Sequence, residues 1–162
     1  MANSSFDIVS TVDLQEVRNA IAQAQKEIAT RYDLKKTNAK LELSDEAITV
    51  TAPDEYTLKQ VRDVLEAKLV RRGVPLKALT YGEIDQALGG TVRQRGALQN
   101  GIPTEKAREI VKLVKGTKRK VQTANQGDQL RDTGKNKDDL QSVIEMLRET
   151  DLGIDMQFTN YR

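Results

Sequence analysis

The chain has 162 residues, of which 31% are charged, 38% hydrophobic and 4% aromatic, and it contains no cysteine, histidine or tryptophan. These absences exclude zinc fingers, disulfide scaffolds, Cys and His nucleophiles and Ser-His-Asp triads. The low hydrophobic fraction favours two small cores over one large core, and the length allows two domains within the usual range of roughly 50–250 residues.

The first half of the chain carries the signals of both strands and helices. Asp13 is a helix N-cap residue followed by apolar residues at spacings of three and four, and Gly73 is typical of a helix end. Apolar and polar residues alternate on either side of Ser44-Asp45-Glu46, as in a hairpin. In chain order, the sequence predicts a strand at 5–10, a helix from 13 to the Arg31-Tyr32-Asp33 segment, hairpin strands at 40–43 and 47–50, a helix from 53 to 73 and a strand at 76–79.

The second half repeats this order after a glycine-containing segment. Gly82, Gly89 and Gly90 predict a linker over residues 83–90. Turn residues at 125–128 separate two alternating runs and predict a second hairpin. After the linker, the sequence predicts a strand at 91–98, a helix from Pro103 to Gly116, hairpin strands at 121–124 and 129–133, a helix from Asn136 to near Gly153 and a strand at 156–159.

The order β-α-β-β-α-β, found twice, is that of the ferredoxin-like unit, in which helices cover one face of an antiparallel sheet and the other face stays open. We therefore predict an α+β protein with two ferredoxin-like, RNP-like βαββαβ domains. The first is expected over residues 1–82 and the second over 91–162, joined by 83–90. In an alternative arrangement, the strands of Phe6 and Phe158 pair with each other and make one domain discontinuous.

Motifs for catalysis and for nucleotide-binding loops are missing. Thr133-Gly134-Lys135 lacks the upstream glycine of a P-loop, and no G-x-G-x-x-G occurs. Asp138-Asp139 fits the first turn of a helix, where the macrodipole favours negative charge. We therefore expect no enzymatic activity, no metal and no cofactor.

Targeting signals are missing as well. Met1–Ser10 has no basic segment followed by an apolar one, so a secretory signal peptide is not predicted. No apolar run approaches the ~20 residues of a membrane-spanning helix. The sequence therefore predicts a cytoplasmic protein without a membrane partner.

Positive charge is concentrated in one block of the sequence. Residues 90–135 contain 11 basic and 4 acidic side chains, against 12 and 14 in residues 1–89 and 3 and 6 in residues 136–162. Such blocks are candidate anion-binding surfaces. A solvated helix face rich in lysine explains the same composition equally well.

The arginines of this block are candidates for the open face of a sheet. If alternate residues of the 91–98 strand face the helices, Arg93 and Arg95 lie on the open face, and the same alternation turns Arg131 outward. The first and third strands of a ferredoxin-like sheet are central neighbours, so the three guanidinium groups are predicted to cluster and to bind phosphate or stack on bases. Alternatively, they are solvated or pair with nearby carboxylates, those of Asp128 and Asp132.

Lysines extend this candidate surface. The loop Lys118-Arg119-Lys120 and Lys135 are candidate anion contacts. The helix before the loop adds four more cations: Lys106, Arg108, Lys112 and Lys115. These cations can bind along the backbone of a polyanion, or they are simply solvated. The RNP1 pattern K/R-G-F/Y is missing, and the central strands offer only Phe6 for base stacking. A standard sequence-specific reader of single-stranded RNA is therefore not predicted.

Short motifs follow one another in a fixed order from one end of the chain to the other. They are Ser5-Phe6-Asp7-Ile8-Val9-Ser10, Asp13-Leu14-Gln15-Glu16-Val17-Arg18-Asn19-Ala20, Glu27-Ile28-Ala29-Thr30-Arg31-Tyr32-Asp33, Ile110-Val111-Lys112-Leu113-Val114-Lys115, Val121-Gln122, Gln126-Gly127-Asp128, Thr133-Gly134-Lys135, Asp138-Asp139-Leu140-Gln141 and Gln157-Phe158-Thr159-Asn160-Tyr161-Arg162. This ordered set resembles the bacterial YajQ family. The resemblance implies a cytoplasmic nucleotide-binding protein of two ferredoxin-like domains, in a family linked to cyclic di-GMP, purine nucleotides, tRNA and regulation with protein or DNA partners.

Two positions depart from the pattern of that family. Leu34 stands where phenylalanine is usual after Arg31-Tyr32-Asp33, which weakens a stacking surface. Asp132 replaces an apolar hairpin residue and is expected to place a negative charge beside Arg131. Arg31 and Tyr32 are candidates for a cation and a base-stacking ring, and the alternative packs Tyr32 on the core.

The leading hypothesis is a non-enzymatic regulator that binds cyclic di-GMP or another purine nucleotide, and RNA such as tRNA. The candidate binding residues are Arg93, Arg95, Arg131, Lys118, Arg119, Lys120, Lys135, Arg31 and Tyr32. One alternative is a protein-interaction module that acts with a transcription regulator and has no small ligand. Another is a nucleotide hydrolase that uses carboxylates.

Overall fold

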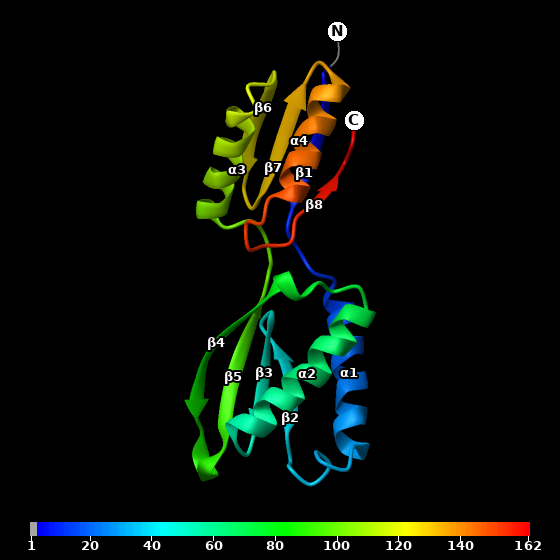
Figure 1. The fold of residues 1–162 in the computed structure, drawn as a ribbon, viewed down its shortest axis with the longest axis vertical. Coiled ribbons are helices and arrows are strands. Elements are labelled where there is room, and N and C mark those ends of the chain that lie inside the picture. The colour runs from blue at the N-terminus through cyan, green and yellow to red at the C-terminus, as the bar shows by residue number, and fades with distance from the viewer. Residues whose placement is uncertain (1–2) are drawn as a thin grey trace. The chain divides into compact units, whose positions relative to one another are not determined.

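The computed structural model describes residues 3–162, and residues 1–2 of the N-terminal segment considered above lie outside them. The described chain forms two compact units. Unit 1 consists of residues 3–11 and Asn100–Arg162, and unit 2 consists of Val12–Gln99. Each unit has one four-stranded antiparallel sheet and two α-helices (Figure 1), which confirms the predicted α+β class with two ferredoxin-like domains.

Unit 1 has the strand order of a ferredoxin-like sheet, β6-β7-β1-β8. Its elements are β1 (Ser4–Val9), α3 (Thr104–Gly116), β6 (Val121–Gln126), β7 (Gln129–Gly134), α4 (Lys137–Glu149) and β8 (Gln157–Thr159). In the register between β1 and β8, Ile8 lies opposite Phe158. The strands of Phe6 and Phe158 therefore pair, and the domain is discontinuous, as in the alternative arrangement.

Unit 2 is inserted between β1 and α3 of unit 1. Its elements are α1 (Leu14–Thr30), β2 (Lys40–Ser44), β3 (Ala47–Ala52), α2 (Glu55–Arg71), the 3-10 turn η1 (Leu76–Ala78), β4 (Leu79–Gln86), the 3-10 turn η2 (Leu88–Gly90) and β5 (Val92–Leu98). The strand order is β2-β3-β5-β4. The last strand, β5, takes the central place that the first strand takes in unit 1, so unit 2 is a circularly permuted ferredoxin-like unit.

The domain boundaries differ from the predicted ones at 82 and 91. The expected linker, residues 83–90, lies inside unit 2, where β4 continues to Gln86 and pairs with β5. Gly89 and Gly90 have positive φ values of 77° and 79° and form a turn in the β4–β5 connection. The two strands β1 and β5 have similar alternating patterns, and such a pattern does not identify the sheet in which a strand pairs. The sequence predicts β1 in the same domain as α1 and α2, and β5 in the same domain as α3 and α4. In the structure, β1 pairs in unit 1 and β5 pairs in unit 2.

Each unit has its own hydrophobic core. Phe6, Ile110 and Leu147 are buried in unit 1, and Ile48 and Leu65 are buried in unit 2. Full burial of one such side chain contributes about 1.5–3 kcal/mol. The two sheets are therefore stabilised by separate sets of contacts.

The predicted helix boundaries follow the expected capping chemistry. The Asp13 carboxylate accepts a hydrogen bond from the Gln15 N–H at 2.9 Å, and the Asn136 side chain accepts one from the Asp138 N–H at 2.8 Å. Gly73, after α2, has a φ of 79°, which favours glycine. Among residues 3–162, none of the helices combines the length and the apolar character needed to cross a bilayer.

Candidate functional site

The three predicted open-face arginines do not form one cluster. Arg93 and Arg95 lie on β5 in the sheet of unit 2, whereas Arg131 lies on β7 in the sheet of unit 1. β7 pairs with β6 on one side and with β1 on the other. The β1 strand brings Asp7, and not an arginine, opposite Arg131. The predicted cluster is wrong because it assumed that β5 and β7 share a sheet.

Arg131 is held by an ion pair within unit 1. Its Nε lies 2.7 Å from Oδ1 of Asp7, whose side chain is 1% exposed. The Asn160 amide donates to the second carboxylate oxygen at 2.8 Å. The hydrogen bond from Arg131 is the largest cause that lowers the pKa of Asp7. The opposite charges at the centre of this open face therefore pair with each other.

Arg93 and Arg95 have the exposed positions that strand alternation predicts. Their neighbours along β5 are buried, and both arginines face away from the helices. Arg93 lies opposite Thr51 and Asp85 in the register, and Arg95 lies opposite Thr49. No hydrogen bond or ion pair joins either guanidinium to another side chain within the described chain, so both are available to a ligand.

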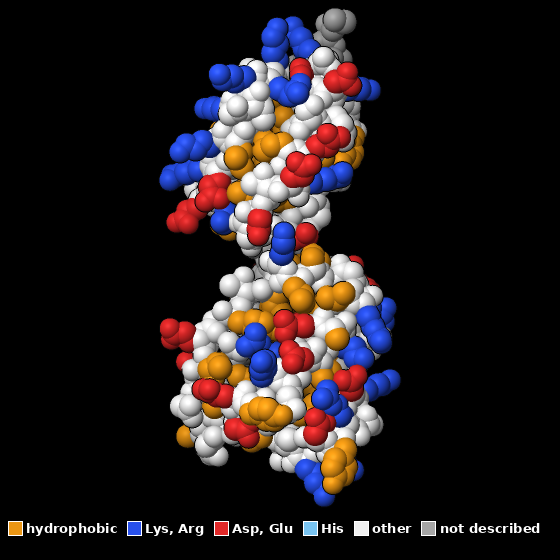
Figure 2. Space-filling view, in the orientation of Figure 1, with side chains coloured by type: hydrophobic (Ala, Val, Ile, Leu, Met, Phe, Trp, Pro, Cys, Tyr) orange, Lys and Arg blue, Asp and Glu red, His pale blue; other side chains and the backbone are white. Residues whose placement is uncertain are grey.

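The tribasic loop and Lys135 lie at the same end of unit 1. Val121 pairs with Gly134, so Lys118, Arg119 and Lys120 precede β6 where Lys135 follows β7. Figure 2 shows Lys and Arg side chains over this end and along the side of unit 1 that carries α3. The Arg119 guanidinium donates to Oδ1 of Asp139 at 2.9 Å. This loop therefore offers two lysines without such a partner and one arginine that is already paired.

Arg31 and Tyr32 lie at the end of α1 in unit 2. Tyr32 is 89% exposed, so it does not pack on the core, and Leu34 takes the buried position instead. Lys35 Nζ lies 5.4 Å from the centroid of the Tyr32 ring. Arg31 Nε lies 2.8 Å from Oδ1 of Asp33. The ring is thus open to stacking, while the arginine is paired locally.

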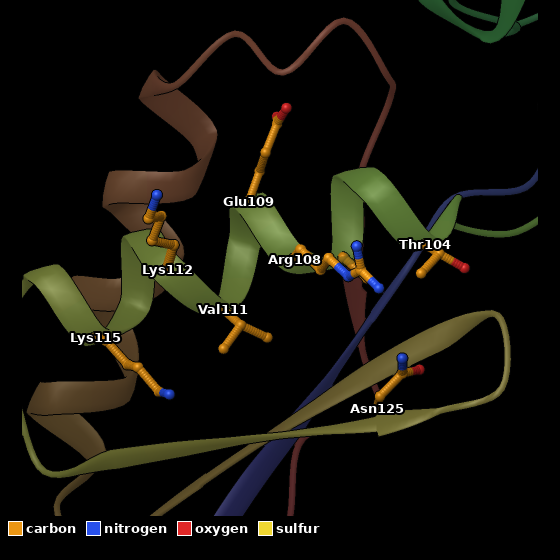
Figure 3. A pocket seen from close by; sticks show the side chains of 8 residues that line it. Thr104, Arg108, Glu109, Val111, Lys112, Lys115 and Asn125 are labelled. Carbon is orange, nitrogen blue, oxygen red and sulfur yellow. The ribbon is translucent and has the colours of Figure 1, made fainter.

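A groove of about 610 Å³, the α3–β6 groove, lies between α3 and the edge strand β6 of unit 1. Cationic side chains line it from α3: Arg108, Lys112 and Lys115. Spacings of four and three residues place them on successive turns of the helix. In Figure 3, Lys115 extends from α3 toward the strand, whereas Lys112 points away from the sheet, as Glu109 does.

The other groove residues supply apolar and hydrogen-bonding surface. Ala107 and Val111 are apolar residues of α3, and Val111 points toward β6 (Figure 3). Asn125 rises from β6 toward the helix, near Thr104. The groove therefore combines cations, apolar carbon and an amide, which are the groups that recognise phosphate, a ring face and a base edge.

The groove cations have no acidic partner in the described part of the chain. The one acidic residue that lines the groove, Glu109, forms its ion pair with Lys106 at 3.6 Å. No ion pair joins a described carboxylate to Arg108, Lys112 or Lys115. Across residues 3–162, no three acidic side chains gather as a metal site would require.

Comparison with known proteins matches the YajQ-like nucleotide-binding protein family over residues 4–162. The chain belongs to the YajQ family. It is 56% identical to a protein of Koribacter versatilis over 162 residues, covering 100% of this chain and 99% of that protein. It is 58% identical to a protein of Carboxydothermus hydrogenoformans over 160 residues, covering 98% and 97%. It is 52% identical to a Bacillus cereus protein over 160 residues, covering 99% and 98%, and all three relatives are named nucleotide-binding proteins.

The departure from the YajQ pattern at Asp132 has a different consequence from the expected one. Asp132 does not lie beside Arg131, because adjacent residues of β7 point to opposite faces of the sheet. Its side chain is fully buried on the helix-covered face, opposite Phe6 and Thr123 in the register. Neither carboxylate oxygen has a well-aligned hydrogen-bond partner among residues 3–162. Burial raises the pKa of Asp132 to about 6, and the Thr123 hydroxyl offsets only part of this effect.

Sequence reasoning finds some residues of the α3–β6 groove and misses others. The sequence identifies Arg108, Lys112 and Lys115 as cations, but their periodicity fits a solvated helix as well as it fits a binding face. It predicts Asn125 in a turn, although the residue lies inside β6. The YajQ motifs give no direct signal for Asn125, because its place in the groove depends on the packing of α3 against an edge strand.

Proposed function

We propose that the chain binds an anionic nucleotide in the α3–β6 groove and that it acts without catalysis. The observation that carries this proposal is the row of three groove cations that have no carboxylate partner in the described chain. Like charges placed side by side repel one another, and an anionic ligand removes that repulsion. The names of the relatives, which describe nucleotide-binding proteins, agree with this choice of ligand.

Each part of a nucleotide has a complementary group in the groove. The phosphate binds to Arg108 and Lys115, since charge-assisted hydrogen bonds to phosphate are stronger than neutral ones. The base lies against Val111, and the Asn125 amide contacts its edge. The groove volume of about 610 Å³ falls within the roughly 300–1,000 Å³ range of ligand pockets.

The proposed ligand class is a purine nucleotide, with cyclic di-GMP as the specific candidate. A cyclic dinucleotide carries two phosphates, and three cations of α3 line the groove. Binding would allow the protein to act as a cytoplasmic regulator. A longer nucleic acid such as tRNA would continue onto Lys118, Lys120 and Lys135, while Arg93 and Arg95 are proposed as separate phosphate contacts on unit 2.

The test is a titration of cyclic di-GMP, GTP and tRNA into the wild-type protein and into the triple variant Arg108→Gln/Lys112→Gln/Lys115→Gln. We expect a loss of about tenfold or more in nucleotide affinity, because the hydrogen bonds that are removed involve charged groups. The matched control, Lys26→Gln/Lys59→Gln/Arg71→Gln, removes three exposed cations from the helices of unit 2. Equal affinities of the two triple variants would place the ligand elsewhere, and no binding by the wild-type protein would favour the protein-interaction alternative.

A further inference from the structure

Aromatic residues, which are few in this chain, gather on one side of unit 1. The chain has four tyrosines and two phenylalanines. Three of these six rings, Phe6, Phe158 and Tyr161, lie together, with ring centroids 6.0 Å apart for Phe6–Phe158 and 6.3 Å apart for Phe6–Tyr161. Phe6 is 1% exposed, whereas Tyr161 is 60% exposed. The cluster therefore runs from the core to a ring that solvent or a ligand can reach.

A pocket of about 270 Å³, the Tyr161 pocket, adjoins this exposed ring. Its walls are the start of β1, one side of α4 and residues 161–162. It shares no residue with the α3–β6 groove. The groove lies at β6, at one edge of the sheet β6-β7-β1-β8, whereas the pocket lies at β1, toward the other edge.

The position of Tyr161 is fixed by the backbone. The Arg162 N–H donates to the Ser5 carbonyl at 3.0 Å, and the Ser5 N–H donates to the Arg162 carbonyl at 3.2 Å. Asn160 has a positive φ of 55° and shifts the register by one residue after Thr159, which lies opposite Asp7. The pairing therefore continues beyond β8 and holds the Tyr161 ring beside Phe6.

The pocket lining has groups for a ring and for an anion. Phe6, Leu140 and Ile144 provide apolar surface next to Tyr161. Lys137, in the first turn of α4, provides a positive charge on the side of Tyr161. Arg162 pairs with Ser5, so its side chain is turned to the other face of the sheet, where its charge helps to lower the pKa of Asp7. Lys137 forms no ion pair with a carboxylate of residues 3–162. Tyrosine beside an unpaired cation is a combination that proteins use to stack a base and hold its phosphate.

We infer that the Tyr161 pocket is a second ligand site, which binds a nucleoside monophosphate independently of the α3–β6 groove. The base stacks on Tyr161 and the phosphate lies against Lys137. A volume of about 270 Å³ is close to the lower end of the roughly 300–1,000 Å³ range of ligand pockets, so it suits one nucleotide better than a dinucleotide. The inference does not require that the groove binds anything.

The experiment uses GMP and AMP as probes, with the groove variant Arg108→Gln/Lys112→Gln/Lys115→Gln as the background. Calorimetry gives the affinity, and amide NMR shifts locate the site. We expect shifts at Ser4, Ser5, Lys137 and Gln141, which line the pocket. Shifts confined to other regions, or no binding of either nucleotide, would overturn the inference, whatever the groove itself binds.

Two substitutions separate the stacking contact from the charge contact. Tyr161→Leu should weaken GMP binding by about 5- to 150-fold, the range measured for removal of one base–aromatic stack, and Tyr161→Phe should retain it. Lys137→Gln should weaken GMP binding but leave guanosine binding unchanged. Tyr56→Leu, at a tyrosine that is 74% exposed on α2, is the matched control and should have no effect. Equal effects of Tyr161→Leu and Tyr56→Leu would rule out the stacking site.

Discussion

The two units use one architecture but distribute their polar groups differently. Unit 1 pairs Arg131 with Asp7 at the centre of its open sheet face, while Arg108, Lys112 and Lys115 on α3, at the edge of the sheet, form no ion pair with a carboxylate of residues 3–162. In unit 2, no described side chain forms an ion pair with Arg93 or Arg95 on the central strand of the open face. The comparison shows that the fold alone does not decide where a ligand surface lies, since the register of charged residues across neighbouring strands decides it.

The buried polar residues of the two sheets differ in the same way. In unit 2, Gln94 is 5% exposed, donates to the Gly82 carbonyl at 2.8 Å and accepts from Arg62 at 3.2 Å. In unit 1, Asp132 is fully buried and has no such partners in the described chain. Burial of an amide that keeps its hydrogen bonds costs little free energy of folding. Burial of a carboxylate without hydrogen bonds costs more, unless the carboxylate takes up a proton.

The largest expected effect tests whether the two cores are independent. Leu147→Ala creates a cavity in unit 1 at a side chain that is 0% exposed and should destabilise that unit by about 2–5 kcal/mol. Hydrogen exchange should show lower protection of unit 1 amides and little change in unit 2. Leu65→Ala should have the reverse effect.

A control at the surface completes this test. Leu88 is 97% exposed, so Leu88→Ala should leave the protection of both units unchanged. If Leu147→Ala lowers protection equally in both units, the chain unfolds as one cooperative body and the cores are not independent.

The second prediction concerns the pH dependence caused by Asp132. Its folded-state pKa of about 6 lies above its ordinary value of 3.8, so the folded state binds this proton more tightly than the unfolded state. The free energy of unfolding should therefore fall as pH rises from about 4 to about 6, by up to ~3 kcal/mol for a shift of about two pKa units. Asp132→Asn should remove this slope, and Asp132→Val should stabilise unit 1 at pH 7.

Urea unfolding at pH 4 and pH 7 measures the effect. The difference in the free energy of unfolding between variant and wild type removes the contribution of other groups that titrate and leaves that of Asp132. A stability gain of the same size at both pH values would contradict an ionisation effect and would point to packing alone.

Most local elements are predictable from the sequence because their signals are local. Asp13 and Asn136 cap helices through their own side chains, and the hairpin of β6 and β7 forms around Gly127. Partner choice is not local, since β1 and β5 both fit a central strand position. Because β5 pairs in unit 2 and β1 pairs in unit 1, Arg93 and Arg95 lie in a different sheet from Arg131. The predicted cluster of three arginines therefore does not form.

The candidate sites are harder to predict for a related reason. Tyr161 and Phe6 are 155 positions apart in the chain and meet only through the pairing of β1 with β8. The resemblance to the YajQ family indicates the ligand class but not the place where a ligand binds. The unpaired state of the groove cations depends on which carboxylates lie nearby, and composition does not contain this information.

The third prediction concerns the partnered amide of unit 2. Gln94→Leu should destabilise unit 2 by about 1–3 kcal/mol, because the Gly82 carbonyl and the Arg62 guanidinium would each be left without this partner. Urea unfolding followed by hydrogen exchange locates the destabilised unit. Asp132→Val is the contrasting variant, since it removes a buried carboxylate whose polar neighbour, the Thr123 hydroxyl, has no well-aligned hydrogen bond to it. Destabilisation by both variants would show that the two buried groups are equivalent after all.

The smallest expected effect compares the two open faces directly. The affinity for a single-stranded oligonucleotide should depend less steeply on salt in Arg93→Gln/Arg95→Gln, with the slope of log K against log salt smaller by about 0.7 for each phosphate that is no longer neutralised. Arg131→Gln should leave the slope unchanged, because its guanidinium already pairs with Asp7. Filter binding between low and high salt measures these slopes, and Lys59→Gln/Arg71→Gln controls for net charge. A larger change in Arg131→Gln than in the double variant would mean that the ion pair opens for the ligand. The number of arginines on a sheet face would then predict binding better than their pairing does.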